Sequence, residues 1–273
     1  MGFRAIRFGK LSTEEREQVF ANSQASLYLP EGFQGRKYLL EDRGLDVETV
    51  ANFRLGYVPL NIDHAFSGRI VMPIFDLCGN LLALSVRPAT TDERIDDEFG
   101  KYWNESYDKG RHLYGLNLAK FWIVRFGFAI IVEGQMDTMA MHSWGMANTV
   151  GVLGGAFTPF QAMQLKRWTK NFVLLFDGDK AGKKHVERCE EVLSYYEWRL
   201  PAHSSEWSLP TGFKNRISSV PQCGLSHVNA SIPNGTDPSK FLKEHGGGAM
   251  RKMVLTAMND NLMKVSDEWA TWA

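Results

Sequence analysis

The strongest constraint on the fold is an alternation, beginning at Phe126, between short apolar runs and stretches with a helical pattern. Each apolar run has the length and composition of a buried strand. Because strands that alternate with helices are joined by right-handed crossovers, this pattern predicts a mainly parallel sheet. The expected strands cover 128–132, 149–153 and 172–176, and the expected helices begin near Met136, Thr158 and Ala181.

Two of the expected strands end in acidic residues. Glu133 follows the first strand directly, and the third strand leads into Asp177 and Asp179. The carboxyl ends of strands in an open α/β sheet form its ligand crevice, so we expect these three carboxylates to converge at one edge. In extended backbone, Asp177 and Asp179 would point to the same side. Oxygen ligands favour Mg²⁺ or Mn²⁺, which predicts a divalent metal site there.

Each acidic motif also has a plainer interpretation when it stands alone. An acid after a buried strand commonly starts a loop, and Asp-Gly-Asp is a frequent turn sequence. The motif lacks the later Glu of a calcium-binding EF-hand, and 178–184 lacks the spacing of a phosphate-binding P-loop. The combination of both acidic motifs on neighbouring strands favours the metal site. The nearby basic residues are expected to form a solvated face: Lys180, Lys183, Lys184 and Arg188.

The N-terminal part of the chain has a different pattern, in which helices precede a β-hairpin. Ser12 and Glu15 have the spacing of a capping box at the start of a helix. The segments 69–75 and 81–86 are rich in β-forming residues, and Cys78-Gly79-Asn80 between them suits a hairpin turn. The expected helices run to Leu29, over 35–44 and over 46–53.

These patterns predict an α/β protein with three parts. Residues 1–120 are expected to form an α+β subdomain, 121–245 a parallel-sheet catalytic domain, and 246–273 a helical tail introduced by three glycines. The stretch 201–233 is rich in Ser, Pro, Gly and Asn, so we expect a long loop there, before one further element near Asp237.

Composition limits the classes of function. The longest apolar stretch, 126–132, is far shorter than the roughly 20 residues that cross a bilayer, so we expect a cytoplasmic protein without membrane contact. The three cysteines form no Cys-x-x-Cys pair, so no zinc site is expected in this chain. The 31 basic and 31 acidic residues give no net charge, so any nucleic-acid binding must depend on local clusters.

Several segments together resemble a known family. Glu133-Gly134 and Asp177-Gly178-Asp179, with 150–155 between them, resemble the TOPRIM fold of primases, topoisomerases and some nucleases. Upstream segments narrow the resemblance to the catalytic core of bacterial and phage DnaG-type primases, over roughly 25–245. These segments are 38–39, 43–45, 53–57, 68–74, 101–106 and 113–116.

The resemblance implies roles for particular residues. It implies metal binding by Glu133, Asp177 and Asp179, with Asp137 and Asp237 in supporting positions. It also implies that four further residues face the incoming nucleotide and the primer-template: Arg87, Lys101, Asn104 and Lys109. Fixed cations there would balance the charge of a triphosphate beside the carboxylates.

The activity that the resemblance implies is two-metal nucleotidyl transfer, which makes short RNA primers on single-stranded DNA from ribonucleoside triphosphates. Neither the zinc ribbon nor the helicase-binding domain of the family is expected in the chain. Template recognition is therefore expected to need a replicative helicase or a separate zinc-binding protein. Both a bacteriophage protein and an excised core fit this expectation.

Two other functions stay open at this point. A TOPRIM nuclease would use the same acids to cut a phosphodiester, although the segment around Lys101 favours a primase. A catalytically weak, primase-derived module that binds DNA or a helicase is the other alternative. Ser239, where the family usually has an acid, favours that module.

Overall fold

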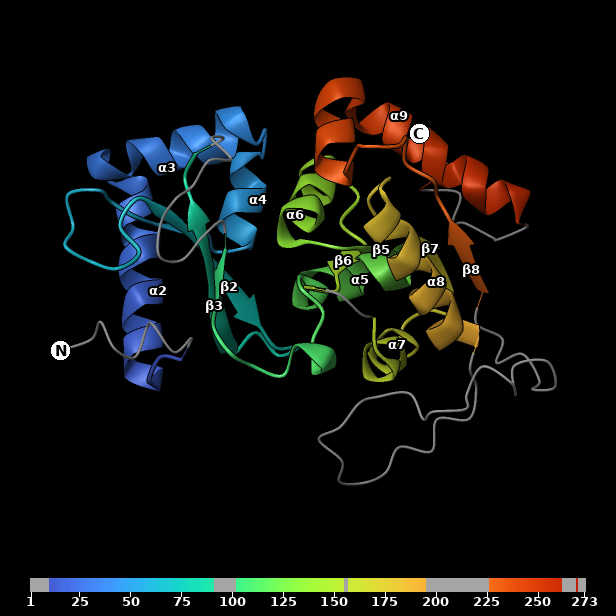
Figure 1. The fold of residues 1–273 in the computed structure, drawn as a ribbon, viewed down its shortest axis with the longest axis horizontal. Coiled ribbons are helices and arrows are strands. Elements are labelled where there is room, and N and C mark those ends of the chain that lie inside the picture. Colours follow the sequence, from blue (N-terminus) through green and yellow to red (C-terminus); the bar gives the residue numbers. More distant parts are fainter. Residues whose placement is uncertain (1–9, 91–101, 155–156, 195–225, 262–268, 270–273) are drawn as a thin grey trace. The chain divides into compact units, whose positions relative to one another are not determined.

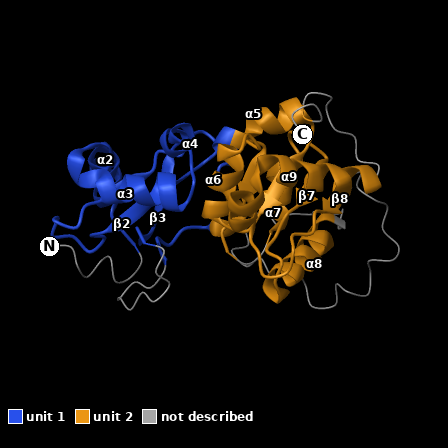
Figure 2. Cartoon of the chain, turned by 90° about the horizontal axis from the view of Figure 1, so that it is seen from above, with its two compact units in different colours: residues 1–108, 114–118 blue, residues 109–113, 119–273 orange. Residues whose placement is uncertain are grey.

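The chain forms two compact units, each with its own sheet (Figures 1 and 2). The computed structural model describes residues 10–90, 102–154, 157–194, 226–261 and 269. The first unit takes its residues from 1–108 and 114–118, and the second from 109–113 and 119–273.

The first unit begins with helix α2 (Thr13–Tyr28), which starts where the sequence predicts. Ser12 Oγ accepts the Glu15 N–H at 3.1 Å, and Glu15 Oε2 accepts the Ser12 N–H at 2.8 Å, so the capping box is confirmed. The helix expected over 35–44 is divided between α3 and a π-helical turn. The shorter helices are η1 (Pro30–Gly32), α3 (Phe33–Lys37), the π-helical η2 (Tyr38–Asp42) and α4 (Val47–Asn52).

An antiparallel sheet forms the other half of the first unit. Its strands lie in the order β1 (Gly56–Val58), β2 (Arg69–Phe75), β3 (Leu81–Pro88) and β4 (Trp103–Asn104). The predicted hairpin is confirmed, since β2 pairs with β3 and Met72 lies opposite Ser85. Asp76 stabilises its turn by accepting the backbone N–H groups of Cys78 and Asn80 at 2.8 and 2.9 Å.

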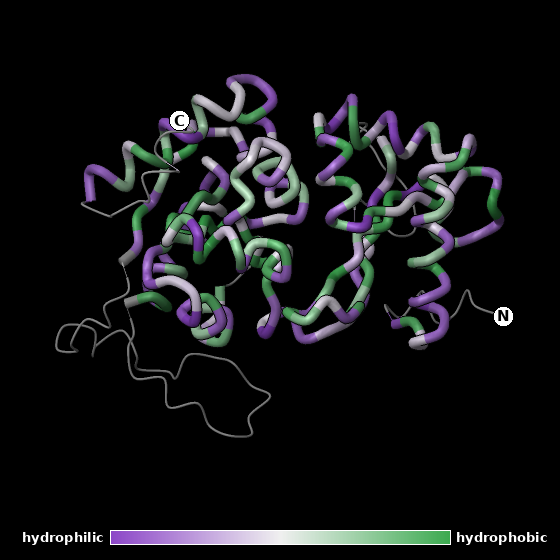
Figure 3. Tube along the Cα trace, turned by 180° about the vertical axis from the view of Figure 1, so that it is seen from behind, coloured by the Kyte–Doolittle hydropathy of each residue, from purple (hydrophilic) through white to green (hydrophobic). Residues whose placement is uncertain are grey.

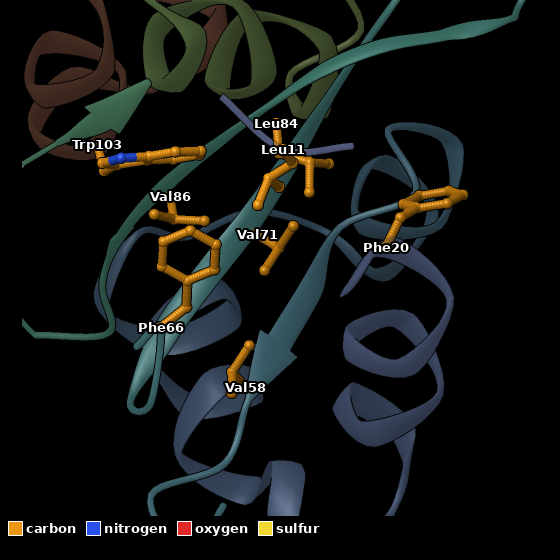
Figure 4. Close-up of a cluster of buried hydrophobic side chains, with 8 residues drawn as sticks. All are labelled: Leu11, Phe20, Val58, Phe66, Val71, Leu84, Val86 and Trp103. Atoms are coloured by element: carbon orange, nitrogen blue, oxygen red, sulfur yellow. The ribbon is translucent and has the colours of Figure 1, made fainter. Parts of the chain in front are cut away.

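The core of this unit lies where the sheet meets the preceding helix. Phe66 and Trp103 pack with ring centroids 4.8 Å apart, and Phe20 extends the cluster from α2 (Figure 4). Burial of such large apolar side chains is the main source of stability for a unit of this size. The cluster consists of Leu11, Phe20, Val58, Phe66, Val71, Leu84, Val86 and Trp103.

The second unit contains the predicted parallel sheet. All three expected strands are present, and all are parallel. Their residues are almost entirely buried, which explains their continuous apolar runs, and they belong to the hydrophobic segments in Figure 3. The strand order is β6 (Thr149–Gly151), β5 (Ala129–Val132), β7 (Asn171–Leu174) and β8 (Ser226–Asn229).

Helices accompany this sheet as the alternation predicts. The helices expected near Met136, Thr158 and Ala181 are α6 (Gln135–Ser143), α7 (Pro159–Leu165) and α8 (Lys180–Ser194). Helix α5 (Leu116–Phe126) precedes β5, and the short η3 (Lys109–Arg111) precedes α5. The four basic residues near the start of α8 are exposed to solvent, as expected: Lys180, Lys183, Lys184 and Arg188.

Strand β8 corrects the expectation of a loop throughout 201–233. Residues 226–229 pair in parallel with β7, and Figure 1 shows β8 next to β7 at the end of the sheet. The sequence Ser-His-Val-Asn contains one strongly apolar residue, as an edge strand allows, so the buried-strand pattern did not detect it.

Helix α9 (Pro238–Asp260) is the element expected near Asp237, and it consists of two helical segments joined at Gly246, where the backbone leaves helical geometry. The helical stretch expected from 246 onward is therefore the second half of α9. Gly246 has φ 80°, which kinks the helix, and Gly247 packs on Trp144 after α6. A Cβ atom at Gly247 would lie 2.9 Å from Trp144 Cε3, so this close approach requires a glycine.

Among the described residues, no helix has both the length and the apolar character needed to span a membrane.

Candidate functional site

The acidic residues lie at the carboxyl edge of the parallel sheet in the second unit. Glu133 follows β5 directly, as predicted. Strand β7 ends earlier than expected, at Leu174, and Gly178 and Asp179 form a bend before α8. The expectation that extended backbone aligns Asp177 with Asp179 is therefore wrong, because the chain already turns into the helix there.

A close backbone contact brings a distant segment to this edge. The Gly178 N–H donates to Thr236 O at 2.9 Å, and a Cβ atom on Gly178 would lie 2.1 Å from Pro233 O. Only a glycine permits such an approach between two backbone segments. Asp237 follows this segment directly, so the contact accounts for its position beside the Asp-Gly-Asp motif.

Asp177 is at the centre of the acidic group. Its pKa is raised from 3.8 to about 7, first by burial and then by nearby carboxylates. Its Oδ1 atom is buried and has no hydrogen-bond partner among the described residues. The carboxylates that raise its pKa are, in decreasing order, Asp137, Glu133, Asp237 and Asp179. The structure thus brings together all five acids that the sequence singled out.

Asp137 lies in the first turn of α6, and its side chain is half-buried. Burial, and next the charge of Asp237, raise its pKa to about 7, although the Ser239 N–H lowers it. That N–H, at the start of α9, donates to Asp137 Oδ1 at 3.2 Å. Ser239 stands where the resembled family usually has an acid, and here its backbone N–H donates a hydrogen bond to Asp137.

Two of the acids also have a structural task. Asp179 Oδ1 accepts the Gly182 N–H at 2.8 Å at the start of α8. Asp237 is the N-cap of α9, and its Oδ1 accepts the Lys240 N–H at 2.6 Å. Each leaves its second carboxylate oxygen outside the cap. A helix N-terminus favours a negative charge, so capping and metal binding are compatible.

His185 is a residue that the sequence analysis missed. Its Nδ1 lies 3.0 Å from Glu133 Oε2, and its ring packs edge-on against Phe176 with centroids 6.0 Å apart. No histidine stood out in the sequence. The available signal was the position of His185 near the start of the helix that follows Asp-Gly-Asp, because that end of α8 faces the carboxyl edge.

The carboxylate side chains of this group are suitable ligands for a divalent ion, but those described in the structure do not converge on one point. Within the described ranges, no three His, Cys, Asp or Glu side chains form a group ready to hold a metal. The donors are nonetheless carboxylates, one oxygen of Asp177 has no partner, and the charges repel each other. A hard cation would offset that repulsion, and small side-chain rotations would bring the oxygens to it.

The residues expected to face the nucleotide belong to both units. In the first unit, Arg87 is buried, and its guanidinium lies over the rings of Tyr38 and Tyr102 at 5.4 and 5.0 Å. Its Nη1 also donates to Tyr102 Oη at 2.7 Å. Asn104 Oδ1, in the same unit, accepts the Ser85 hydroxyl at 2.8 Å.

The two lysines of this set are placed differently. Lys109 lies in η3 of the second unit, where its carbonyl oxygen accepts Gln161 Nε2 at 3.1 Å. Lys101 lies outside the described residues. The acids belong to the second unit as well, so Lys109 is the expected nucleotide contact that shares a unit with them.

Known proteins match both the fold and the sequence. Residues 130–206 match the family described as Toprim-like. A DNA primase of Aquifex aeolicus is 27% identical over 288 residues, which cover 93% of this chain and 49% of the relative. The chain therefore spans about half the length of that curated relative.

Solved structures agree with this similarity. The structure of a DnaG catalytic core matches 88% of this chain and 78% of its own with a TM-score of 0.70 and 25% identity. A DnaG primase catalytic domain bound to single-stranded DNA matches 93% of this chain and 79% of its own, with a TM-score of 0.70 and 23% identity.

The parallel sheet, the acids at its carboxyl edge and these matches show that the second unit is similar to Toprim-like α/β domains. More particularly, the chain is similar in sequence to DNA primases, and its fold is that of the DnaG catalytic core.

Proposed function

We propose that this chain is the catalytic core of a DNA primase, which joins ribonucleotides on a single-stranded DNA template. The observation that carries the proposal is the group of five acids at the carboxyl edge of the sheet. Four carboxylates around Asp177 raise its pKa, and its buried Oδ1 has no hydrogen-bond partner among the described residues. Similarity to primases along 93% of the chain supports the same activity. The catalytic domain would span about 121–245.

Glu133, Asp177 and Asp179 would hold Mg²⁺ or Mn²⁺, with Asp137 and Asp237 supporting them. When bound, the ions supply charge neutralisation for the attacking 3′-oxygen, the α-phosphate and the departing pyrophosphate. The side chains of the protein position the charges. The Ser239 N–H fixes Asp137, and the α8 cap fixes one oxygen of Asp179 while leaving the other available. Catalysis of this kind needs no protein nucleophile.

The nucleotide and the primer-template would be bound by Arg87, Lys101, Asn104 and Lys109. The aromatic packing around Arg87 supports this role in one respect, because a guanidinium that packs against two tyrosine rings is already oriented before a phosphate arrives. A replicative helicase or a separate zinc-binding protein would be the partner in template recognition.

Primer synthesis itself tests the proposal. The purified chain would be incubated with single-stranded DNA, labelled ribonucleotides and either Mg²⁺ or Mn²⁺, with and without a pre-annealed primer. We expect labelled oligonucleotides, and we expect Asp177→Asn to lose about 100-fold or more of this activity because a metal ligand is lost. Glu187→Gln, which removes an exposed carboxylate on α8, is the matched control and should retain activity.

The possible outcomes separate the candidate functions. Metal-dependent cleavage of the template without synthesis would indicate a nuclease that uses the same acids. DNA binding without either reaction, unchanged in Asp177→Asn, would indicate a binding module and would refute the primase proposal.

A further inference from the structure

One contact in the acidic group joins two elements that are distant in sequence. His185, on α8, places its Nδ1 3.0 Å from Glu133 Oε2, which follows β5. Neither side chain is fully exposed, since 15% of the His185 side chain and 30% of the Glu133 side chain are accessible to solvent. The contact is therefore partly shielded from competing water.

The chemistry of the two groups fixes the direction of the hydrogen bond. A carboxylate can only accept, so His185 Nδ1 carries the hydrogen and donates it to Oε2. This leaves the other oxygen, Oε1, available to a cation. A glutamate has three rotatable side-chain bonds, and holding one of its oxygens restricts these bonds before any ligand arrives.

The position of the imidazole is itself restrained. Its ring packs edge-on against Phe176, a buried residue directly before Asp177. Helix α8, which carries His185, is capped by Asp179 through the Gly182 N–H. His185 therefore connects Glu133 with the segment that contains Asp177 and Asp179, and it does so from a helix whose start is fixed by one of these acids.

We propose that His185 is a positioning residue for Glu133, which holds this carboxylate ready for a divalent cation and thereby raises the affinity of the site. The inference rests on the proposed function, because it assumes that Glu133 is a metal ligand. Ligating carboxylates in proteins are commonly oriented by hydrogen bonds, and the loss of such a partner weakens metal binding by about 10–100-fold.

Direct measurement of Mn²⁺ binding tests this role without relying on activity. The spectrum of free Mn²⁺ in electron paramagnetic resonance disappears as the ion binds, so a titration gives the dissociation constant. We expect His185→Ala to raise this constant about 10–100-fold. His185→Gln keeps a side-chain donor and should stay closer to the unsubstituted protein. His245→Ala removes an exposed histidine from the same unit and should change nothing.

A second measurement separates positioning from direct ligation. Pulsed electron paramagnetic resonance spectra of bound Mn²⁺ detect nitrogen atoms that are bonded to the ion. Because His185 is proposed to act through Glu133, we expect no signal from a His185 nitrogen, so the nitrogen signals of His185→Ala and of the unsubstituted protein should be the same. Primer synthesis by His185→Ala should need more metal for half-maximal rate but should recover most of its rate at saturating metal. A directly bonded His185 nitrogen, or unchanged or tighter Mn²⁺ binding in His185→Ala, would overturn the proposal.

The outcomes also distinguish this inference from the proposed function. If the unsubstituted protein binds Mn²⁺ and Asp177→Asn does not, while His185→Ala binds normally, only the role of His185 fails. If the unsubstituted protein binds no Mn²⁺, both proposals fail. Should His185→Ala lose its fold by circular dichroism, His185→Gln is compared with His185→Phe, which keeps a ring but has no donor. Near wild-type affinity in His185→Gln with weaker binding in His185→Phe supports the need for a donor, and equal affinity in the two variants contradicts it.

Discussion

Arg16 and Glu105 form a doubly hydrogen-bonded ion pair inside the first unit. Arg16 Nη2 lies 2.6 Å from Glu105 Oε1, and Arg16 Nε lies 2.9 Å from Oε2, although the Glu105 side chain is completely buried. Glu105 also accepts the backbone N–H groups of Leu11 and Leu84 at 3.3 and 3.1 Å. One carboxylate thus joins α2, β3 and the segment that precedes α2.

This pair predicts a large effect of Arg16→Ala on stability. Removing one partner leaves a buried charge uncompensated, which typically costs about 3–5 kcal/mol. We therefore expect the free energy of unfolding of the first unit to fall by about 3 kcal/mol in urea titrations, because Arg16 itself is partly exposed. Lys37→Ala, which removes an exposed cation of α3 in the same unit, is the control, so a similar loss there would argue against a specific role for the pair.

The raised pKa of the half-buried Asp137 predicts that stability depends on pH when metal is absent. Its folded pKa of about 7 lies above its ordinary value of 3.8, so the folded state holds a proton that the unfolded state has lost. Stability should therefore fall as the pH rises from about 4 through about 7. Asp137→Asn should flatten this decline and raise the melting temperature at pH 8 by a few degrees. Thermal unfolding in a chelator at pH 5 and pH 8 measures both effects, and a decline equally steep in Asp137→Asn would contradict the assignment.

The proposed contacts of Lys101 and Lys109 with phosphate predict that removing either lysine changes the salt dependence of DNA binding. Lys101→Ala and Lys109→Ala should each reduce the slope of log affinity against log salt by roughly 0.7, the value for one phosphate of a single strand. Fluorescence anisotropy with a labelled single-stranded oligonucleotide measures this slope. Lys252→Ala removes an exposed lysine of α9 as a control. Equal slopes in all four proteins would show that neither tested lysine neutralises a phosphate.

The close approach at Gly178 predicts opposite effects for two glycine substitutions. Gly178→Ala places a methyl group against Pro233 O, so it should displace the segment before Asp237 and weaken both stability and Mn²⁺ binding. Gly248→Ala meets no atom within 4 Å and lies within helix α9, so it should stabilise the second unit by about 1 kcal/mol. Unfolding curves and Mn²⁺ titrations of both variants check this contrast, and normal metal binding in Gly178→Ala would count against the contact.

The central strands were predictable because burial on both faces leaves a clear mark in the sequence. Residues such as Ile130, Ile131 and Val173 are fully buried, and short runs of such residues that alternate with helical stretches indicate parallel strands. Strand β8 left no such mark. Its order beside β7 depends on tertiary pairing, which a polar edge sequence does not reveal.

The candidate site was predictable in its acids but not in the contacts that organise them. Glu133 and Asp177 follow buried strands, so the topology alone places both at one edge. His185 reaches Glu133 from 52 residues away, and Ser239 reaches Asp137 through a backbone N–H that any non-proline residue could supply. Such contacts depend on helix orientation, and residue type gives little indication of them.

The start of α9 has a consequence for the order in which the site can form during synthesis. Ser239 donates to Asp137 across 102 residues, and the segment before Asp237 pairs with Gly178. Once β5 and β7 have emerged from the ribosome, the nascent chain already presents Glu133 and Asp177. It still lacks the start of α9, whose Ser239 N–H fixes Asp137. The chain should therefore acquire its acidic group in finished form only after α9 has docked, so the emergence of α9 controls when the protein can first take up a metal ion.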